Sequence, residues 1–210
     1  MFSEKMLQER AALWKVLCDD FFQRYIEPQE TVLDLGAGFC EFINHIRCKN
    51  KIAVNLHDHT NRFAASDVEV ITGKSTQISH LLGGRTVDVV FTSNFFEHMK
   101  DKNELKETIQ EIHNILKPRG KLLVVQPNIR YAYKVYWDFI DHHIPLSDKS
   151  LSEILSHMGF DIMELKPKFL PWTTKSKIPK HPLLVKLYLK LSFVQSIMGK
   201  QMFLYARKKK

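Results

Sequence analysis

Short apolar runs alternate with stretches of helical periodicity between residues 31 and 126, and this alternation limits the possible folds more than any other feature. The predicted strands cover residues 31–35, 51–56, 68–71, 87–92 and 121–126. The predicted helices cover residues 39–48, 60–65, 75–82 and 101–116. Strands that alternate with helices are joined by crossover connections, which produce a parallel sheet with helices on both faces. The alternation therefore predicts a doubly wound α/β fold.

Both ends of the chain extend this pattern. Residues 4–26 carry apolar side chains at helical spacing and predict an opening helix that covers the domain. After residue 126, a helix over 148–158 and strands over 159–166 and 202–207 are expected. The predicted fold is thus a mostly parallel, seven-stranded sheet with helices on both faces and an antiparallel last strand. Residues 167–200 contain several prolines and interrupt the hairpin expected between the last two strands.

The composition is that of an ordinary globular domain. The 210 residues fit one domain, and a hydrophobic content of 44% supplies enough apolar material for a sizeable core. The three cysteines, Cys18, Cys40 and Cys48, form no CxxC pair and no metal-ligand spacing with histidine. This odd, scattered set predicts reduced thiols in a cytoplasmic protein.

The net charge of +8 favours anionic partners such as phosphorylated substrates, nucleic acid or a membrane surface, and a solvated basic face explains it equally well. Nucleic-acid binding is disfavoured because the basic residues join no recognisable module. The first ten residues are charged and lack the apolar core of a signal peptide. No run of about 18 uninterrupted apolar residues predicts a membrane span.

A turn with two glycines follows the first predicted strand. The strand ends at Asp34 and Leu35, and Gly36, Ala37 and Gly38 come next. Glycine permits backbone conformations and a close approach to a ligand that a β-carbon would block. In a doubly wound sheet this turn lies at the carboxyl ends of the strands, where ligands bind. We therefore expect a ligand here, against the alternatives of a tight turn without ligand and a merely capping role for the carboxylate.

Glu41 argues against a dinucleotide at this turn. The dinucleotide fingerprint requires a third glycine three residues after the second, and Glu41 occupies that position. A carboxylate near a helix N-terminus would repel a pyrophosphate, so a nicotinamide-dependent oxidoreductase is disfavoured. S-adenosylmethionine carries no phosphate, and its amino and sulfonium groups are cationic. Asp34 beside the turn suits such a ligand better.

In this context the motif DLGAG resembles the first motif of class I S-adenosylmethionine-dependent methyltransferases. VDVVFTSNFFEHM is similar to that family's fourth strand and following loop, and LKETIQEIHNILKPRGKLLVVQPN to its helix, turn and fifth strand. The resemblance covers about residues 30–166 and is nearest to the small type-11-like methyltransferases related to the ubiquinone and menaquinone enzymes. It implies a single methyltransferase domain over 1–210. Within it, 1–28 form a helical cover, 29–126 the cofactor-binding half and 127–210 the acceptor-side half.

The resemblance also implies which residues bind S-adenosylmethionine. They follow four successive strands: Asp34, Gly36, Ala37 and Gly38; Asn55 and Leu56; Gly73 and Ser75; and Ser93 and Asn94. Asn55 stands where the family usually has an acidic residue that binds both ribose hydroxyls, and Asp58 is an alternative ribose ligand if the strand runs longer. Cys40 replaces the third motif glycine. Lys74 stands where relatives often have Asp near the adenine, so backbone or Ser75 contacts are expected there.

Methyl transfer requires a nucleophile held in line with the methyl carbon, and an oxygen or nitrogen acceptor also requires a place for its proton. The candidate catalytic residues are His98, Asp141, His142 and His143. One histidine supported by the aspartate would be a competent base. The alternatives are a helix-start role for His98 and a loop-bracing role for Asp141 with one histidine. We predict no metal site, because no glutamate or cysteine partner stands at helical spacing.

Residues 167–200 mix lysines with large apolar side chains. Such a segment can pack as a lid, cover a lipid-bearing acceptor or contact an anionic membrane peripherally. The sequence thus predicts an S-adenosylmethionine-dependent methyltransferase that acts on a small-molecule, glycan or lipid-linked acceptor, with oxygen as the favoured atom. A non-catalytic binding subunit with the same fold is the alternative, because Asn55 and Lys74 depart from the family pattern.

Overall fold

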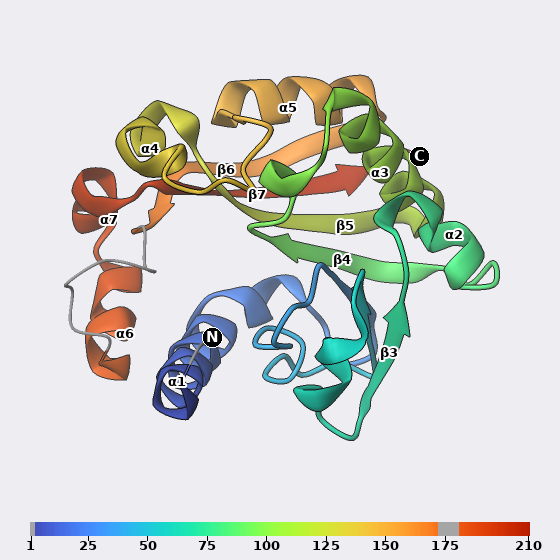
Figure 1. The fold of residues 1–210 in the computed structure, drawn as a ribbon, viewed down its shortest axis with the longest axis horizontal. Coiled ribbons are helices and arrows are strands. Elements are labelled where there is room, and N and C mark those ends of the chain that lie inside the picture. Colours follow the sequence, from blue (N-terminus) through green and yellow to red (C-terminus); the bar gives the residue numbers. More distant parts are fainter. Residues whose placement is uncertain (1–2, 172–180) are drawn as a thin grey trace.

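The centre of the molecule is a seven-stranded sheet with the order β3-β2-β1-β4-β5-β7-β6 (Figure 1). The computed structural model describes residues 3–171 and 181–210. The strands are β1 (Thr31–Leu35), β2 (Asn50–Asn55), β3 (Val68–Thr72), β4 (Val87–Ser93), β5 (Leu116–Pro127), β6 (Phe160–Leu170) and β7 (Gln201–Lys208). β7 is antiparallel to both of its neighbours, and every other pair is parallel. The predicted fold class is confirmed.

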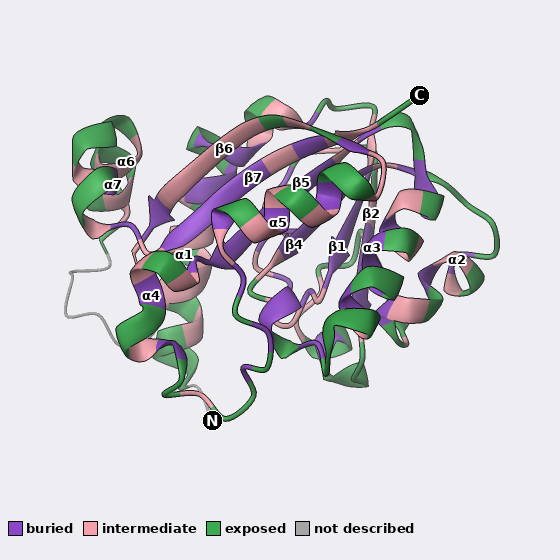
Figure 2. Ribbon diagram, turned by 90° about the horizontal axis from the view of Figure 1, so that it is seen from above, coloured by how far each residue is buried: buried purple, intermediate pink, exposed green. Residues whose placement is uncertain are grey.

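Helices cover both faces of the sheet, and each layer encloses its own hydrophobic core (Figures 1 and 2). On one face pack α2 (Ile78–Leu81), α3 (Lys102–Ile115) and α5 (Asp148–His157). On the other face pack α1 (Glu4–Asp20) and α6 (Pro182–Lys190). The remaining helices are α4 (Ile129–Tyr136), α7 (Ser192–Met198) and the 3-10 turns η1 (Phe22–Tyr25), η2 (Asp58–Arg62), η3 (Ser75–Gln77) and η4 (Phe96–His98).

Alternation along β1 directs its side chains to the two cores in turn. Leu33 and Leu35 belong to the core beneath α3, whereas Val32 belongs to the core beneath α1. Successive side chains of a strand point to opposite faces, so Asp34 lies on the same face as Val32. The fold therefore carries this carboxylate into the interior on the α1 side of the sheet, where it is buried.

The strand order reverses between β1 and β4. From β1 the chain first winds outward through β2 and β3, and it then returns to β4 on the other side of β1. In open α/β sheets this switch point leaves a crevice at the carboxyl ends of the two strands, which is the usual place for a ligand. It lies beside Gly36, after β1, and Ser93, at the end of β4.

Residues 39–48, predicted as a helix, are instead a series of turns over 38–45. Gly38 and Cys40 have φ angles of +50° and +57°, which no α-helix accommodates. Asn44 is held by tertiary bonds, since its side chain donates to the Phe63 carbonyl and accepts from the Ala65 N–H. The helix prediction was wrong because the positive φ angles at Gly38 and Cys40 interrupt the helix at its start, and only isolated helical hydrogen bonds remain, such as that from the Asn44 N–H to the Cys40 carbonyl (3.0 Å).

Other boundaries differ from prediction more modestly. The opening helix ends at Asp20 and gives way to η1, and the predicted helix over 60–65 is the 3-10 turn η2. The turn expected over 117–120 lies inside β5 as a bulge, with Leu116 opposite Val87 and Lys121 opposite Val89. The sequence also missed α4. In the 167–200 segment, β6 runs on to Leu170 and α6 and α7 follow, while residues 172–180 lie outside the described part.

Candidate active site

The turn after β1 requires glycine at Gly36 for two reasons. Its φ angle is +75°, and a β-carbon there would lie 2.4 Å from Cδ2 of Phe95. The Gly36 N–H donates to the Val54 carbonyl (2.9 Å), so the turn is also tied to β2. At Gly38, by contrast, a β-carbon would meet only one backbone oxygen, at 3.9 Å. Gly38 therefore needs glycine for its backbone angle and faces open space.

We expect Gly38→Ala to weaken S-adenosylmethionine binding through the space it fills as well as to strain the backbone. Gly83 is a matched control, because its φ of +59° is similar and nothing lies within 4 Å of its β-position. Both alanine variants should lose about 1 kcal/mol of stability. Only Gly38→Ala should raise the dissociation constant in a calorimetric titration, and equal effects of both variants on binding would contradict this assignment.

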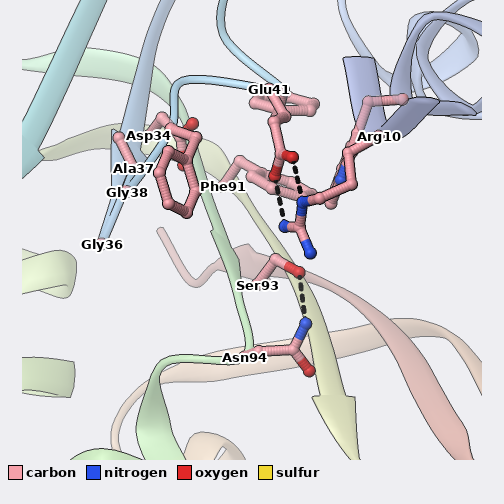
Figure 3. Close-up of a pocket in the computed structure, with 12 residues that line it drawn as sticks. Arg10, Asp34, Gly36, Ala37, Gly38, Glu41, Phe91, Ser93 and Asn94 are labelled. Carbon is pink, nitrogen blue, oxygen red and sulfur yellow. Dashed lines mark hydrogen bonds and ion pairs between the residues drawn. The ribbon is translucent and has the colours of Figure 1, made fainter. Parts of the chain in front are cut away.

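A pocket opens at the switch point beside this turn (Figure 3). Six predicted cofactor-binding residues line it: Asp34, Gly36, Ala37, Gly38, Ser93 and Asn94. The sequence analysis missed the rest of the lining, which consists of Arg10, Trp14, Phe39, Glu41, Phe42 and Phe91. The pocket thus joins the glycine turn, the end of β4 and helix α1.

Asp34 is a buried carboxyl at this pocket, with 3% of its surface exposed. Burial raises its pKa to about 8, a backbone hydrogen bond from Ile43 lowers the pKa, and nearby Glu41 raises it. A buried carboxylate is unfavourable without a compensating positive charge. The site is therefore suited to a cationic ligand group, such as the ammonium or sulfonium of S-adenosylmethionine.

Arg10 and Glu41 form a bidentate ion pair at the pocket wall (Figure 3). The second of its hydrogen bonds, from Arg10 Nη2 to Glu41 Oε2, measures 2.7 Å. Arg10 precedes Trp14 by four residues and so lies on the same face of α1. The four-residue spacing between Arg10 and Trp14 was the sequence feature that could have predicted Arg10 at this site. Its guanidinium supplies the pocket with a group that can bind a carboxylate.

Aromatic rings form the apolar wall behind these charges. Phe42 stacks on Phe91 with ring centroids 3.6 Å apart, and Trp14 meets Phe91 edge-on at 6.0 Å. Ser93 and Asn94 lie at the end of β4, where Asn94 Oδ1 accepts a hydrogen bond from Gln201 of β7 (2.7 Å). The Asn94 N–H donates to the Val125 carbonyl (2.9 Å), which fixes the loop beside the pocket.

The other four predicted cofactor residues do not line this pocket. The Asn55 side chain donates to the His57 carbonyl (3.2 Å), and Leu56 is exposed. A β-carbon on Gly73 would meet Leu81 at 2.5 Å, so packing explains that glycine. The Ser75 hydroxyl lies 2.8 Å from that of Thr108 in the interior, facing α3. Cofactor contacts at these positions remain predictions.

A second polar group follows the β4 loop and consists of Glu97, His98 and His142. One carboxylate oxygen and one nitrogen from each ring lie within 4.8 Å of one another. His98 Nδ1 bonds to the Asp141 carbonyl (2.9 Å), and His142 Nδ1 bonds to the Tyr136 carbonyl (2.9 Å). A backbone carbonyl can only accept, so each Nδ1 carries the proton and each Nε2 holds the lone pair. We call this set the Glu97 group.

Glu97 is the member that the sequence analysis missed. It is 1% exposed, its Oε2 accepts from Gln126 Nε2 (2.8 Å), and burial raises its pKa above the usual range. The pKa of His142 is lowered, first by burial and then by His98. The Asp141 carboxylate lies 3.4 Å from His98 Nδ1, whereas the His143 side chain is exposed. The adjacent Glu-His pair after a strand end was the available signal.

The geometry can accept a proton or hold a divalent cation. His98 is partly exposed, and its Nε2 lies 4.0 Å from Glu97 Oε1, so the buried carboxylate can stabilise a protonated imidazole. Two histidines and a carboxylate are also a ligand set that transition metals accept. The structure therefore brings together three predicted catalytic residues, Asp141 included, around an unpredicted glutamate.

Comparison with known proteins agrees with this geometry. A family model described as a methyltransferase domain matches residues 6–165. A SAM-dependent methyltransferase from Archaeoglobus fulgidus shares the fold with a TM-score of 0.69 and 19% identity, over 98% of this chain and 100% of that one. One from Methanosarcina mazei gives 0.65 and 15%, over 90% and 96%. An uncharacterized Methanocaldococcus jannaschii protein is 35% identical over 122 residues, 56% of this chain and about half (51%) of that protein.

A switch-point pocket with a buried aspartate and two glycines, on a sheet of this order, is typical of class I S-adenosylmethionine-dependent methyltransferases. The chain belongs to the methyltransferase domain family, whose model matches most of its length. S-adenosylmethionine is the cofactor that this family membership implies. The residues present fit that molecule, with Asp34 for its positive charge and Arg10 for its carboxylate.

Proposed function

We propose that this methyltransferase transfers the methyl group to an oxygen of a small molecule or glycan, either free or linked to a lipid. The Glu97 group is the observation that carries the proposal. It follows Ser93 and Asn94, which line the cofactor pocket, by only a few residues. An oxygen acceptor must lose a proton as it attacks, and the histidines of this group are the bases we assign to that proton.

The pocket residues position the cofactor. Bound S-adenosylmethionine supplies an electrophilic methyl group on sulfur. Asp34 faces the cationic part of the molecule, the positive charge of Arg10 attracts its carboxylate, and Gly36 and Gly38 let the backbone approach closely. Catalysis then depends mainly on positioning the acceptor in line.

His98 receives the acceptor's proton at Nε2. Its Nδ1–H is fixed by the Asp141 carbonyl, so the ring is oriented and the lone pair is on the correct nitrogen. The imidazolium that forms is stabilised by Glu97 at 4.0 Å and by the Asp141 carboxylate at 3.4 Å. His142, whose pKa is lowered, stays neutral and packs against His98 with ring centroids 5.2 Å apart.

A panel of acceptors tests this proposal. Sugars, quinone precursors and small phenols are incubated with the protein and S-adenosylmethionine, and release of S-adenosylhomocysteine is measured. Turnover with hydroxyl-bearing acceptors, and loss of turnover when that hydroxyl is replaced by hydrogen, is the expected result. Turnover that requires an amine or a carbon nucleophile would contradict the assignment to oxygen.

We expect the rate of methyl transfer not to depend on a divalent metal. Since a histidine base and its carboxylate suffice for proton transfer, dialysis against EDTA should leave the rate within about twofold. The measurement is the rate before and after dialysis, followed by addition of Zn²⁺, Mn²⁺ or Mg²⁺. If chelation abolishes turnover and one of these cations restores it, the Glu97 group is a metal site and not a simple base.

A further inference from the structure

Helices α6 and α7, together with Leu191 between them, carry large exposed apolar side chains. Exposed fractions are 69% for Leu183, 46% for Leu184, 53% for Leu187, 42% for Leu191, 73% for Phe193 and 65% for Ile197. We call these six residues the apolar face. Both helices lie at one edge of the molecule, by the end of β6 and the start of β7 (Figure 1). Apolar side chains exposed in such a concentrated stretch mark an interaction site.

The inner side of α6 is well anchored. Val185, Tyr188 and Leu189 pack on the core beneath α1, and the Tyr188 hydroxyl donates to the Phe169 carbonyl (2.8 Å). Gln195 of α7 donates to the carbonyls of Tyr188 and Leu189 (3.2 and 3.1 Å), which ties the two helices together. The helices are therefore built into the domain, and the apolar face is a separate surface that this packing leaves exposed.

The charged residues between 167 and 200 indicate which kind of partner binds the apolar face. The sequence from 167 to 200 contains no Asp or Glu. Its lysines are Lys168, Lys175, Lys177, Lys180, Lys186, Lys190 and Lys200. Lys186 and Lys190 lie beside the leucines on α6, and Lys186 also reaches Asp20 of α1 (3.1 Å). Apolar side chains flanked by lysine, without any acidic residue, complement a surface of lipid tails and anionic head groups.

The contact would be peripheral. No helix in the described residues is long and apolar enough to cross a bilayer. Nine- and seven-residue helices with apolar outer side chains instead fit shallow insertion at the level of the head groups. α6 also packs on α1, whose Arg10 and Trp14 line the cofactor pocket. A lipid surface in contact with α6 would therefore lie near α1, which lines the cofactor pocket.

We propose that α6 and α7 dock the enzyme onto an anionic lipid surface, with the apolar face inserted among the lipids and Lys186 and Lys190 of α6 against their phosphates. Where the proposed function holds as well, the acceptor is one that a membrane carries. The docking itself depends only on α6 and α7, so it stands or falls independently of the methyl acceptor.

Vesicle co-sedimentation of the full chain tests the docking without cofactor or acceptor. The vesicles contain equal parts of phosphatidylglycerol and phosphatidylcholine, or phosphatidylcholine alone. We expect binding to the anionic vesicles, weakening as NaCl is added. The double variant Leu187→Ser/Phe193→Ser should bind about tenfold more weakly, because two large side chains no longer enter the lipid. Lys190→Gln should lose about fivefold.

Matched controls separate docking from general effects. Met163→Ser removes an exposed apolar side chain from β6, and Lys106→Gln removes an exposed lysine from α3. Both should bind like the wild type, and all variants should keep the wild-type affinity for S-adenosylmethionine. Equal binding by the double variant, or no binding to anionic vesicles at low salt, would overturn the proposal. A dimer in sedimentation equilibrium that the double variant dissociates would assign the face to a second copy instead.

Discussion

Replacing His98 with Gln lowers kcat by about 10²- to 10⁴-fold, the range that general-base catalysis contributes. Glutamine keeps a polar side chain of similar length but cannot take up the acceptor's proton. S-adenosylmethionine binding should stay within about twofold of wild type, because His98 does not line the cofactor pocket. The measurement is steady-state kinetics with the best hydroxyl acceptor from the panel, together with a cofactor titration.

His143→Gln is the matched control, because it changes a neighbouring candidate histidine whose side chain is exposed. It should lower kcat less than about threefold. Glu97→Gln should act through His98 and shift the pH profile of kcat, since it removes the carboxylate that stabilises the imidazolium. If His143→Gln is the more damaging change, proton transfer has been assigned to the wrong histidine.

Asp34→Asn weakens S-adenosylmethionine binding by about 10- to 100-fold and raises the melting temperature of the unliganded protein. Asparagine has the same shape and can still accept the Ile43 hydrogen bond. Loss of a charge-assisted contact costs about 1.5–3 kcal/mol of binding. Removing a buried, uncompensated carboxyl should in turn raise Tm by about 3 °C or more at pH 8. Calorimetric titration and a thermal melt measure the two effects.

The raised pKa of Asp34 also predicts the direction in which stability and cofactor affinity change with pH. The folded pKa of Asp34, about 8, is above the ordinary value, so the folded state binds this proton more tightly than the unfolded state does. Stability of the unliganded protein should therefore fall, on account of Asp34, as pH rises from about 4 to 8. Cofactor affinity should increase toward pH 8, with proton release. Asp67→Asn, at an exposed aspartate, should change neither trend, and a wild-type affinity that is flat with pH would contradict the assignment.

Much of the fold could be predicted because its signals are local. Each strand is a short apolar run bounded by turn residues, and α3 has a cap at Asp101, whose side chain accepts from the Asn103 and Glu104 N–H groups. Residues 38–45 could not be predicted in this way. The turns there are stabilised by distant partners, including Asp34 for Ile43 and Phe63 for Asn44, which no local pattern reveals.

The residues of the candidate site also fall into those that the local sequence predicts and those that it does not. Asp34, Gly36 and Gly38 are adjacent in sequence at a strand end, so their meeting at one pocket followed from the fold class. Arg10 reaches that pocket from a helix that only tertiary packing places there. Burial of Glu97 depends on Gln126 and on the loop whose His143 and Ile144 N–H groups donate to the Glu97 carbonyl. Such contacts are set by the assembled structure.

The pocket beside β1 is tested most directly by calorimetry. S-adenosylmethionine is titrated into the wild-type protein and into Gly38→Ala, and NADH serves as the competing ligand. Saturable one-to-one binding of S-adenosylmethionine, weakened in the variant and absent for NADH, is the predicted result. Binding of NADH at that pocket, or an S-adenosylmethionine affinity that Gly38→Ala leaves unchanged, would contradict the account.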